Sequence, residues 1–313
     1  MDKHAKIYKP EDCIDEMLYG LKHGKVKGTT TYSPLLDNAW TWRLQEFNIW
    51  TGYGNEGKSL MLKQVCLIKT LEEGCNFIFS SPEDYPPGEF FDDMIHTIAG
   101  ATTDKHFPEV ISPELYIHCY ELIKDHFDFV YIKPPHNTIE ATIEQAEKIM
   151  KTKKITGLII DPILKFSKSK TAPDRDDQYA GYIGALLTDT ARVNNISVHM
   201  VMHQLTPKLT EMGIYPKPNM YSVKGGGSWA DGVDNVIFVQ RPMYARDKED
   251  TGVVFGSQKI KKQKLVGIPQ EVPLTFDRFS NRYRTEAGDF LFDFDKFIKK
   301  PYKTLSVEDE KDI

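Results

Sequence analysis

The sequence has few cysteines, and none has the spacing of a metal site or a redox pair. The four cysteines are Cys13, Cys66, Cys75 and Cys119, and no two of them form a C-x-x-C pair. The histidines likewise lack metal-ligand spacing such as H-E-x-x-H. This usage argues against a disulfide framework and a zinc site, and it predicts reduced thiols in a cytosol-like compartment.

Long apolar runs are also missing. No stretch reaches the roughly 18 apolar residues that a membrane span requires, and Met1-Asp2-Lys3-His4 leads into no apolar segment of a secretion signal. We therefore expect no membrane partner. The predicted location is the cytoplasm, or the host cytoplasm if the protein is viral or from a phage.

The chain has no excess of positive charge. Its 40 lysines and arginines against 45 acidic residues give a formal net charge of -5. No global basic field therefore attracts nucleic acid, and any such contact has to come from local clusters. At 313 residues and 40% hydrophobic residues, the chain can bury a full core as one large domain or two.

The most informative stretch is Gly52-Tyr53-Gly54-Asn55-Glu56-Gly57-Lys58-Ser59, which fits the phosphate-binding pattern G-x-x-x-x-G-K-[ST]. Residues 47–51 before it are typical of a short buried strand, and apolar residues recur after it at helical spacing. In that context the backbone N–H groups and the helix N-terminus can hold phosphates. The alternative is a glycine-rich turn at a helix start.

This P-loop pattern predicts a site for ATP, or another nucleoside triphosphate, with Mg²⁺. Lys58 would reach the β- and γ-phosphates, and the Ser59 hydroxyl would bind the metal ion. The residues of the loop predicted to contact the nucleotide are Gly52, Gly54, Asn55, Glu56, Gly57, Lys58, Ser59 and Leu60.

Two later strands are each followed by a carboxylate. Residues 76–80 precede Ser81-Pro82-Glu83-Asp84, and residues 155–160 precede Asp161. A carboxylate after a strand beside a P-loop is suited to orient and deprotonate water, so Glu83 is the predicted general base, with Asp84 as the near alternative and a solvated acidic turn as the neutral one. Asp161 fits the Walker B position, which holds Mg²⁺, commonly through water.

A further buried strand, residues 197–202, ends at His203-Gln204. A polar amide beside Walker B can sense the γ-phosphate, so Gln204 is the predicted sensor and His203 the alternative. A polar cap at the end of the strand is the neutral interpretation.

Two segments are candidates for DNA contact. The first is the lysine-rich run that contains Lys168 and Lys170, which is either a solvated face or a loop that meets phosphates. The second is Lys224-Gly225-Gly226-Gly227, whose backbone N–H groups could approach a phosphate backbone without reading bases. A flexible linker is the alternative for the glycines.

Alternating strands and helices predict an α/β fold with a sheet flanked by helices. The remaining expected elements are helices in 86–126, 138–150 and 177–195, strands at 127–132 and 233–239, and a basic strand at 256–264 that pairs with 270–276 as a C-terminal β-hairpin.

Three parts of the chain are predicted: an N-terminal arm (1–30), an ATPase core (31–295) and an acidic C-terminal tail (296–313). In the arm, a helix from Pro10 to near Gly24 has Ile14, Met17 and Leu21 on one face. That face either folds back on its own domain or docks on a neighbouring subunit.

The ordered motifs resemble the core of the ring-shaped replicative DNA helicases of the DnaB and Twinkle type, over roughly residues 30–285. The motifs that carry the resemblance are GYGNEGKS (52–59), FSSPE (79–83), GLIID (157–161), HMVMHQ (199–204), the glycine loop before VDNVIFVQR (233–241), and KKQK (261–264) before VPLTF (272–276). The resemblance implies a RecA-like P-loop NTPase with a mostly parallel twisted sheet, a hexamer with nucleotide between subunits, and single-stranded DNA in a central channel. It also implies a nucleotide-base contact near Arg241.

One departure concerns the finger that enters the neighbour's active site. The family usually has Lys-Gln-Arg where this chain has Lys262-Gln263-Lys264, and lysine lacks the planar fork of arginine. Either Lys264 substitutes for it, or another arginine such as Arg278 reaches over. No primase-like segment is present in the sequence, so we expect a separate primase or loader.

The predicted function is an ATP-dependent replicative DNA helicase core that unwinds duplexes as a ring. One alternative is a RecA-like recombinase or another ring ATPase without unwinding. The other is a nucleotide-binding regulator or helicase-loading partner with little turnover.

Overall fold

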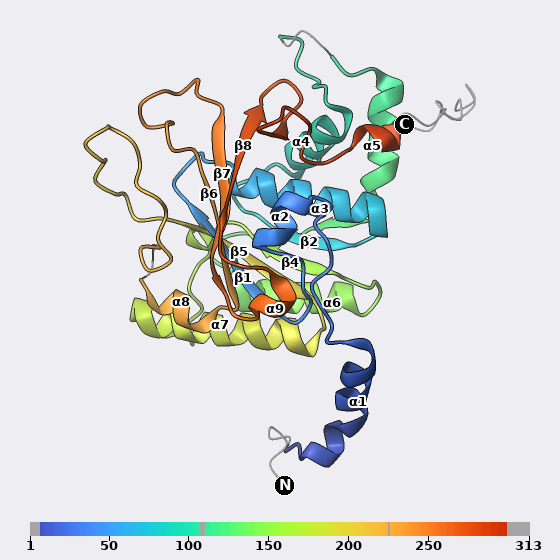
Figure 1. Cartoon of the computed structure of the whole chain (residues 1–313), viewed down its shortest axis with the longest axis vertical. Coiled ribbons are helices and arrows are strands. Elements are labelled where there is room, and N and C mark those ends of the chain that lie inside the picture. The colour runs from blue at the N-terminus through green and yellow to red at the C-terminus, as the bar shows by residue number, and fades with distance from the viewer. Residues whose placement is uncertain (1–6, 107–109, 225, 299–313) are drawn as a thin grey trace.

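The central feature of the structure, a computed structural model that describes residues 7–106, 110–224 and 226–298, is a nine-stranded sheet (Figure 1). Its strand order is β3-β2-β4-β5-β1-β6-β7-β8-β9. The first six strands in that order run parallel, and β7, β8 and β9 continue antiparallel. The predicted α/β class, the mostly parallel sheet and the C-terminal hairpin are confirmed.

The strands are β1 (Phe47–Gly52), β2 (Phe77–Ser80), β3 (Phe127–Phe129), β4 (Gly157–Ile160), β5 (Ser197–His203), β6 (Asn235–Gln240), β7 (Gly252–Ile260), β8 (Glu271–Asp277) and β9 (Arg282–Thr285). The α-helices are α1 (Ile14–His23), α2 (Pro34–Ala39), α3 (Lys58–Glu73), α4 (Pro87–Ala99), α5 (Pro113–Ile123), α6 (Ile139–Met150), α7 (Asp176–Val193), α8 (Ser228–Gly232), α9 (Gln263–Val266) and α10 (Asp295–Ile298). Short 3₁₀ helices occupy η1 (Pro10–Cys13) and η2 (Ile163–Lys165).

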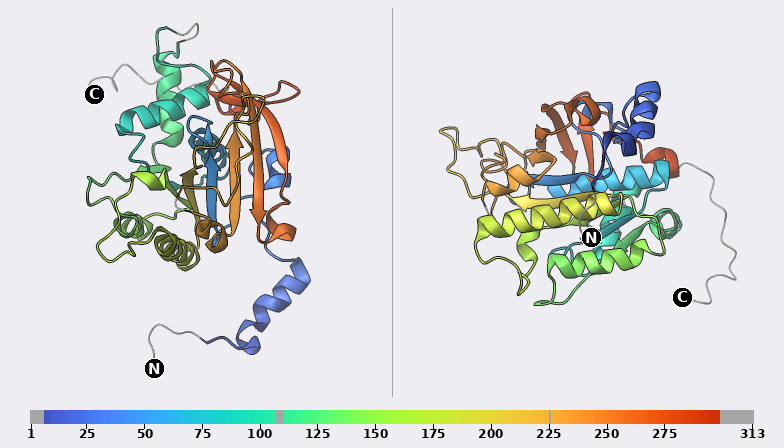
Figure 2. Two further views of the ribbon diagram at one scale, coloured as in Figure 1. Left: turned by 90° about the vertical axis from the view of Figure 1, so that its left-hand side faces the viewer. Right: turned by 90° about the horizontal axis from the view of Figure 1, so that it is seen from below.

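Both faces of the parallel strands are covered, which explains why those strands are apolar almost throughout. Successive side chains point to opposite faces, so Trp50 packs toward α3 while Phe47 and Ile49 pack toward α6 and α7. Figure 2 shows α6 and α7 side by side on their face of the sheet. The sheet is thereby fixed between two apolar layers.

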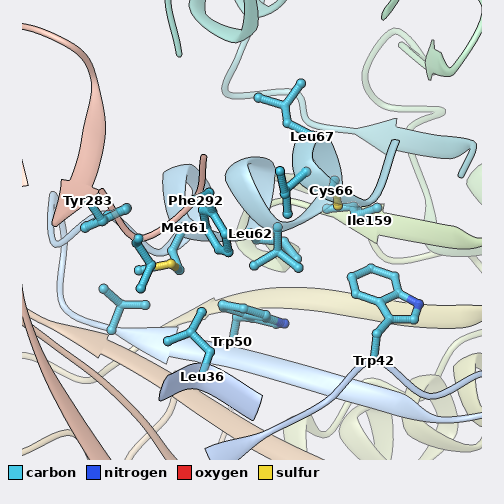
Figure 3. Close-up of a cluster of buried hydrophobic side chains, with 14 of the residues drawn as sticks. Leu36, Trp42, Trp50, Met61, Leu62, Cys66, Leu67, Ile159, Tyr283 and Phe292 are labelled. Atoms are coloured by element: carbon cyan, nitrogen blue, oxygen red, sulfur yellow. The ribbon is translucent and has the colours of Figure 1, made fainter. Parts of the chain in front are cut away.

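The α3 face holds an aromatic core (Figure 3). Trp42 and Trp50 lie between the strands and the α3 side chains Leu62 and Cys66. The buried His199 stacks on Trp42 with ring centroids 4.1 Å apart and accepts a 3.0 Å hydrogen bond from Trp50 Nε1 at Nδ1. Burial lowers the pKa of His199 to about 3, so this imidazole is neutral and structural.

Two strand boundaries differ from the sequence prediction. The strand expected at 127–132 ends at Phe129, and the basic strand expected at 256–264 runs from Gly252 to Ile260. The second difference has a clear cause, because β6 begins at Asn235 and its partner is Ile260, so β7 has no neighbour to pair with beyond that residue. Lys264 consequently lies on α9 and not on a strand.

The N-terminal arm projects from the body of the molecule (Figure 1). No residue of α1 is buried, and Ile14, Met17, Leu18 and Leu21 are all exposed. The segment after the helix is attached to the core, since Thr29 pairs with Trp42. Of the predicted tail, residues 299–313 lie outside the described part of the chain. Among the described helices, none combines the length and the apolar character needed to cross a bilayer.

Candidate functional site

The P-loop connects β1 to α3, and two of its glycines are required by space. Gly52 has φ 154°, and an added Cβ would lie 2.2 Å from the Val239 carbonyl oxygen. Gly57 has φ 87°, and its added Cβ would lie 2.4 Å from Tyr283 Oη, which donates a 3.0 Å hydrogen bond to the Gly57 carbonyl. No side chain fits at either position without displacing its neighbour. Gly54 faces open space instead.

Two buried charges hold the loop in shape. Glu56 is fully buried and accepts a 2.7 Å hydrogen bond from the Tyr53 backbone N–H. Lys58 is 4% exposed, and its Nζ donates to the Tyr53 carbonyl at 2.5 Å. Burial raises the pKa of Glu56 to about 7 and lowers the pKa of Lys58, which Glu56, Asp161 and Glu83 partly restore. The ammonium group thus lies inside the curve of the loop, where phosphate oxygens could accept from it.

The predicted metal ligands meet at the start of α3. Ser59 donates a hydrogen bond to Asp161, which follows β4 and is 5% exposed. Burial raises the pKa of Asp161 to about 7, opposed by the Ser59 hydrogen bond. Within residues 7–106, 110–224 and 226–298, no cluster of three acidic, histidine or cysteine side chains could hold a metal alone. One hydroxyl and one carboxylate fit Mg²⁺, which is typically bound through few protein ligands together with substrate phosphates.

Glu83 and Asp84 follow β2 and face different neighbours. Glu83 borders the cavity beside the P-loop, is half exposed, and lies 3.9 Å from Lys165 Nζ. Asp84 accepts a 2.8 Å hydrogen bond from Ser81 Oγ, and its charge raises the pKa of Asp161. Glu83 is therefore the carboxylate with access to the cavity, and Asp84 is the one nearer the metal end.

The cavity measures about 500 Å³ and lies at the C-terminal ends of β1, β4 and β5. Ligands of open α/β sheets bind at this edge. The lining residues are Tyr53, Gly54, Glu83, Pro162, Leu164, Lys165, His203, Gln204, Thr206, Pro207, Tyr215 and Lys224.

Both sensor candidates line the cavity, but their surroundings differ. Gln204 is buried, and its Nε2 donates to Thr51 Oγ1 at 2.8 Å and to the Asn219 carbonyl at 3.0 Å. It therefore joins the end of β1 to the long connection between β5 and α8. His203 is the last residue of β5, and burial lowers its pKa to about 4, assisted by Lys58, Lys224 and Lys165. His203 is thus neutral at neutral pH.

The predicted DNA-contact residues are distributed over separate surroundings. Lys224 lies in the lining of the cavity, and its backbone N–H donates to the His203 carbonyl at 2.9 Å. Gly226 has φ 97°, Gly227 caps α8, and Gly225 lies outside the described residues. Lys168 is engaged by its own loop, 2.9 Å from Asp176, whereas Lys170 is exposed.

The sequence did not point to the stacked pair Tyr53 and Tyr215. Their ring centroids are 4.7 Å apart and their planes differ by 27°. Gln240 Nε2 fixes the same connection by donating to the carbonyls of Tyr215 and Pro216 at 3.1 and 3.0 Å. The connection from β5 to α8 is thus held against the P-loop. No periodicity or motif in residues 205–222 signals this contact.

Arg241 follows β6, on the far side of the P-loop from the cavity lining. Its Nη2 donates to the Asp250 carbonyl at 2.5 Å, and its guanidinium lies 4.1 Å from the Tyr244 ring centroid. Its charge lowers the pKa of Glu56, which places it near the loop.

Lys264 does not approach this site. The strands β6 and β7 are antiparallel, with Gln240 opposite Val254 at the P-loop edge and Asn235 opposite Ile260 at the other. Lys264 follows Ile260 on α9 and is exposed, so about 20–25 Å of strand separates it from its own P-loop edge. Arg278, just after β8, is held 2.5 Å from Glu249.

No protein-family model matches the sequence. No curated protein matches it either. Two solved structures are similar in fold. The first is the ATPase domain of a DnaB-like replicative helicase, with a TM-score of 0.72 and 14% identity, covering 90% of this chain and 99% of that one. The second is a DnaB-like replicative helicase studied with its interactions with primase, with a TM-score of 0.69 and 14% identity, covering 90% of this chain and 67% of that one. The chain therefore has the RecA-like fold of DnaB-like helicase ATPase domains.

Proposed function

We propose that the protein is an ATP-dependent replicative DNA helicase core that moves along single-stranded DNA as a homohexameric ring. One observation carries the proposal: phosphate, metal and water-activating groups gather at one edge of the sheet, while the predicted finger, Lys264, lies at the other. A chain built this way can complete its active site only with a second copy.

Within one site, each residue has a separate role. Lys58 and the P-loop amides would hold the phosphates, and Ser59 with Asp161 would hold Mg²⁺. Glu83 reaches the cavity as the base that orients and deprotonates water, and Gln204 is suited to report the state of the γ-phosphate because it already contacts β1 and the β5–α8 connection. ATP with Mg²⁺, when bound, supplies the phosphoryl group and offsets its negative charge.

The arm supports the ring. Four apolar side chains of α1 are exposed, although amphipathic helices in folded proteins normally bury this face. We infer that it docks on a neighbouring copy. A charged finger from that neighbour would then reach the phosphates held by this chain.

DNA would contact the loops at the cavity edge, with Lys224, Gly226 and Gly227 toward the sugar-phosphate backbone. Because these groups carry charge and backbone N–H donors and no base-reading pattern, binding should depend on salt and show little base preference. A primase or loader would be a separate protein, and the cytoplasm remains the predicted compartment.

The deciding experiment measures ATP turnover with and without single-stranded DNA, together with unwinding of a forked duplex and molar mass in solution. We expect DNA-stimulated turnover, strand separation and a six-fold mass. Turnover without strand separation would favour a recombinase-like ring ATPase. ATP binding without turnover, in a monomer, would favour a nucleotide-binding regulator.

A further inference from the structure

The helix that carries Lys264 is hydrogen-bonded to the root of the N-terminal arm. The Gly28 backbone N–H donates to the Leu265 carbonyl at 2.8 Å. Thr41 donates twice to the Val266 carbonyl, from its backbone N–H at 2.7 Å and from Oγ1 at 2.6 Å. Figures 1 and 2 both show α9 next to the segment that leads up from α1. The arm root and α9 therefore form one hydrogen-bonded unit.

Close approach in this unit depends on glycine. A Cβ added to Gly28 would lie 2.1 Å from Thr41 Oγ1 and 2.8 Å from Thr41 Cβ. A Cβ added to Gly267 would lie 2.7 Å from the Ala39 carbonyl carbon, at φ 150°. Any larger residue at Gly28 would force apart the two groups that hold Leu265 and Val266.

Two buried carboxylates fix the residues just before α9. Lys261 Nζ lies 3.1 Å from Asp234, whose other oxygen accepts from the Phe47 backbone N–H at 3.1 Å. Lys262 Nζ lies 3.6 Å from Glu46, which is 1% exposed. In contrast, Lys264 is exposed, and none of the described residues forms an ion pair with it.

The arm root is also tied to the P-loop helix. Lys69, a fully buried side chain of α3, donates to Thr29 Oγ1 at 3.0 Å and to the Thr30 carbonyl at 3.1 Å. Tyr32 Oη adds a 3.0 Å hydrogen bond to Glu73 near the end of α3. The root thus has fixed contacts to both α3 and α9.

We propose that Gly28 and Thr41 are positioning residues that hold α9 so that Lys264 points into the nucleotide site of a second copy of this chain. The inference rests on the proposed function, in which Lys264 acts in trans. It adds that the root of the arm, which lies outside every catalytic motif, sets the geometry of that contact.

The test uses full-length chains and mixed assemblies. Donor chains carry Glu83→Gln, so they keep Lys264 but hydrolyse little ATP. Acceptor chains carry Lys264→Ala and keep an intact site. Mixing the two should restore DNA-stimulated turnover, because each acceptor site then faces a donor Lys264.

Gly28→Ala is then placed in one class at a time. In donor chains it should lower the restored kcat by on the order of a hundredfold, with the KM for ATP unchanged, because a misplacement of about 1 Å suffices for such a loss. In acceptor chains it should have no effect. Thr41→Val, which removes only one side-chain hydrogen bond, should give a loss of about fivefold in the same class and folds even if Gly28→Ala does not. Gly181→Ala, where an added Cβ meets nothing within 4 Å, is the matched control.

Equal losses in both classes would overturn the positioning role, because a general effect on folding or assembly does not depend on the class. No loss in the donor class would also overturn it. If wild type turns over ATP but mixing restores nothing, Lys264 does not act in trans and the inference fails while the ATPase assignment survives. If wild type shows no DNA-stimulated turnover, the proposed function itself fails.

Discussion

The two ends of the central sheet treat buried charge in opposite ways. At the C-terminal ends of the parallel strands, burial raises the pKa values of Glu56 and Asp161 to about 7 and lowers that of Lys58. At the other end, Glu46 is paired with Arg43 at 2.8 Å, and Asp234 with Lys261 at 3.1 Å. Perturbed pKa values are typical of sites that await a ligand, whereas fully paired groups are typical of a rigid support. The first end is suited to bind and react, and the second to hold a neighbour's finger in place.

The largest expected effect comes from the reactive end. Glu83→Gln should lower ATP turnover by about 10²–10⁴-fold with ATP affinity retained, because the amide cannot accept the proton of the attacking water. Single-turnover hydrolysis and nucleotide binding measure the two separately. Asp84→Asn is the matched variant and should keep most of the turnover, since Asp84 is engaged by Ser81. If Asp84→Asn were the more damaging change, the base would be Asp84.

The supporting end gives the next effect. Lys264→Ala should lower kcat by on the order of a hundredfold, less than the loss of an arginine finger, because lysine is a point charge. Lys264→Arg should raise kcat above wild type, since the planar fork can contact two phosphate oxygens. Steady-state turnover at saturating ATP and DNA checks both. Lys151→Ala, another exposed lysine, serves as the control.

The pKa of Asp161 predicts the pH dependence of Mg²⁺ binding. Below about 7 the carboxyl group is protonated, so Mg²⁺ has to displace a proton, and the affinity for Mg²⁺–ATP should fall about tenfold per pH unit. Above about 7 the affinity should be flat. Because the pKa values of Glu56 and Asp161 are raised, the fold without nucleotide is stabilised by their protonation, and that stability is lost as the pH rises through about 7.

Titration calorimetry over the pH units on either side of about 7 measures the dependence on pH. Glu56→Gln is the control that should keep the Mg²⁺-linked slope, because Glu56 faces the Tyr53 backbone and not Ser59. A slope that survives in Asp161→Asn would assign the titration to another group.

The smallest effect concerns DNA. Lys224→Ala should weaken single-strand binding and reduce the slope of log K against log salt by about 1, with basal ATP turnover retained. Fluorescence anisotropy at several salt concentrations gives the slope. Equal losses of DNA binding and of basal turnover would instead assign Lys224 to the nucleotide cavity, whose lining it shares.

Much of the reactive end could be predicted because its residues follow strands in short linear motifs. Ser59, Glu83, Asp161 and Gln204 each stand at the end of a β-strand or the start of a helix, and parallel strands bring those ends to one edge. The fold class followed from the same alternation.

What the sequence could not provide depends on partners distant along the chain. The length of β7 is set by where β6 begins, so Lys264 was expected on a strand and lies on α9. The Tyr53–Tyr215 stack and the hydrogen bond from Gly28 to Leu265 join segments without periodic patterns. Lys168 looked like a free cation, but Asp176, eight residues later, engages it.

The tryptophans give the molecule two built-in optical probes. Of its four, Trp40, Trp42 and Trp50 share one cluster around His199, whereas Trp229 is buried at the start of α8, directly after the glycine loop. Light emitted by the cluster should follow unfolding of the core and ignore ligands. Emission from Trp229 should change when DNA engages the loop, and Trp229→Phe should abolish that change while the signal of unfolding persists. A DNA-dependent change that survives Trp229→Phe would mean that the core itself responds to the strand.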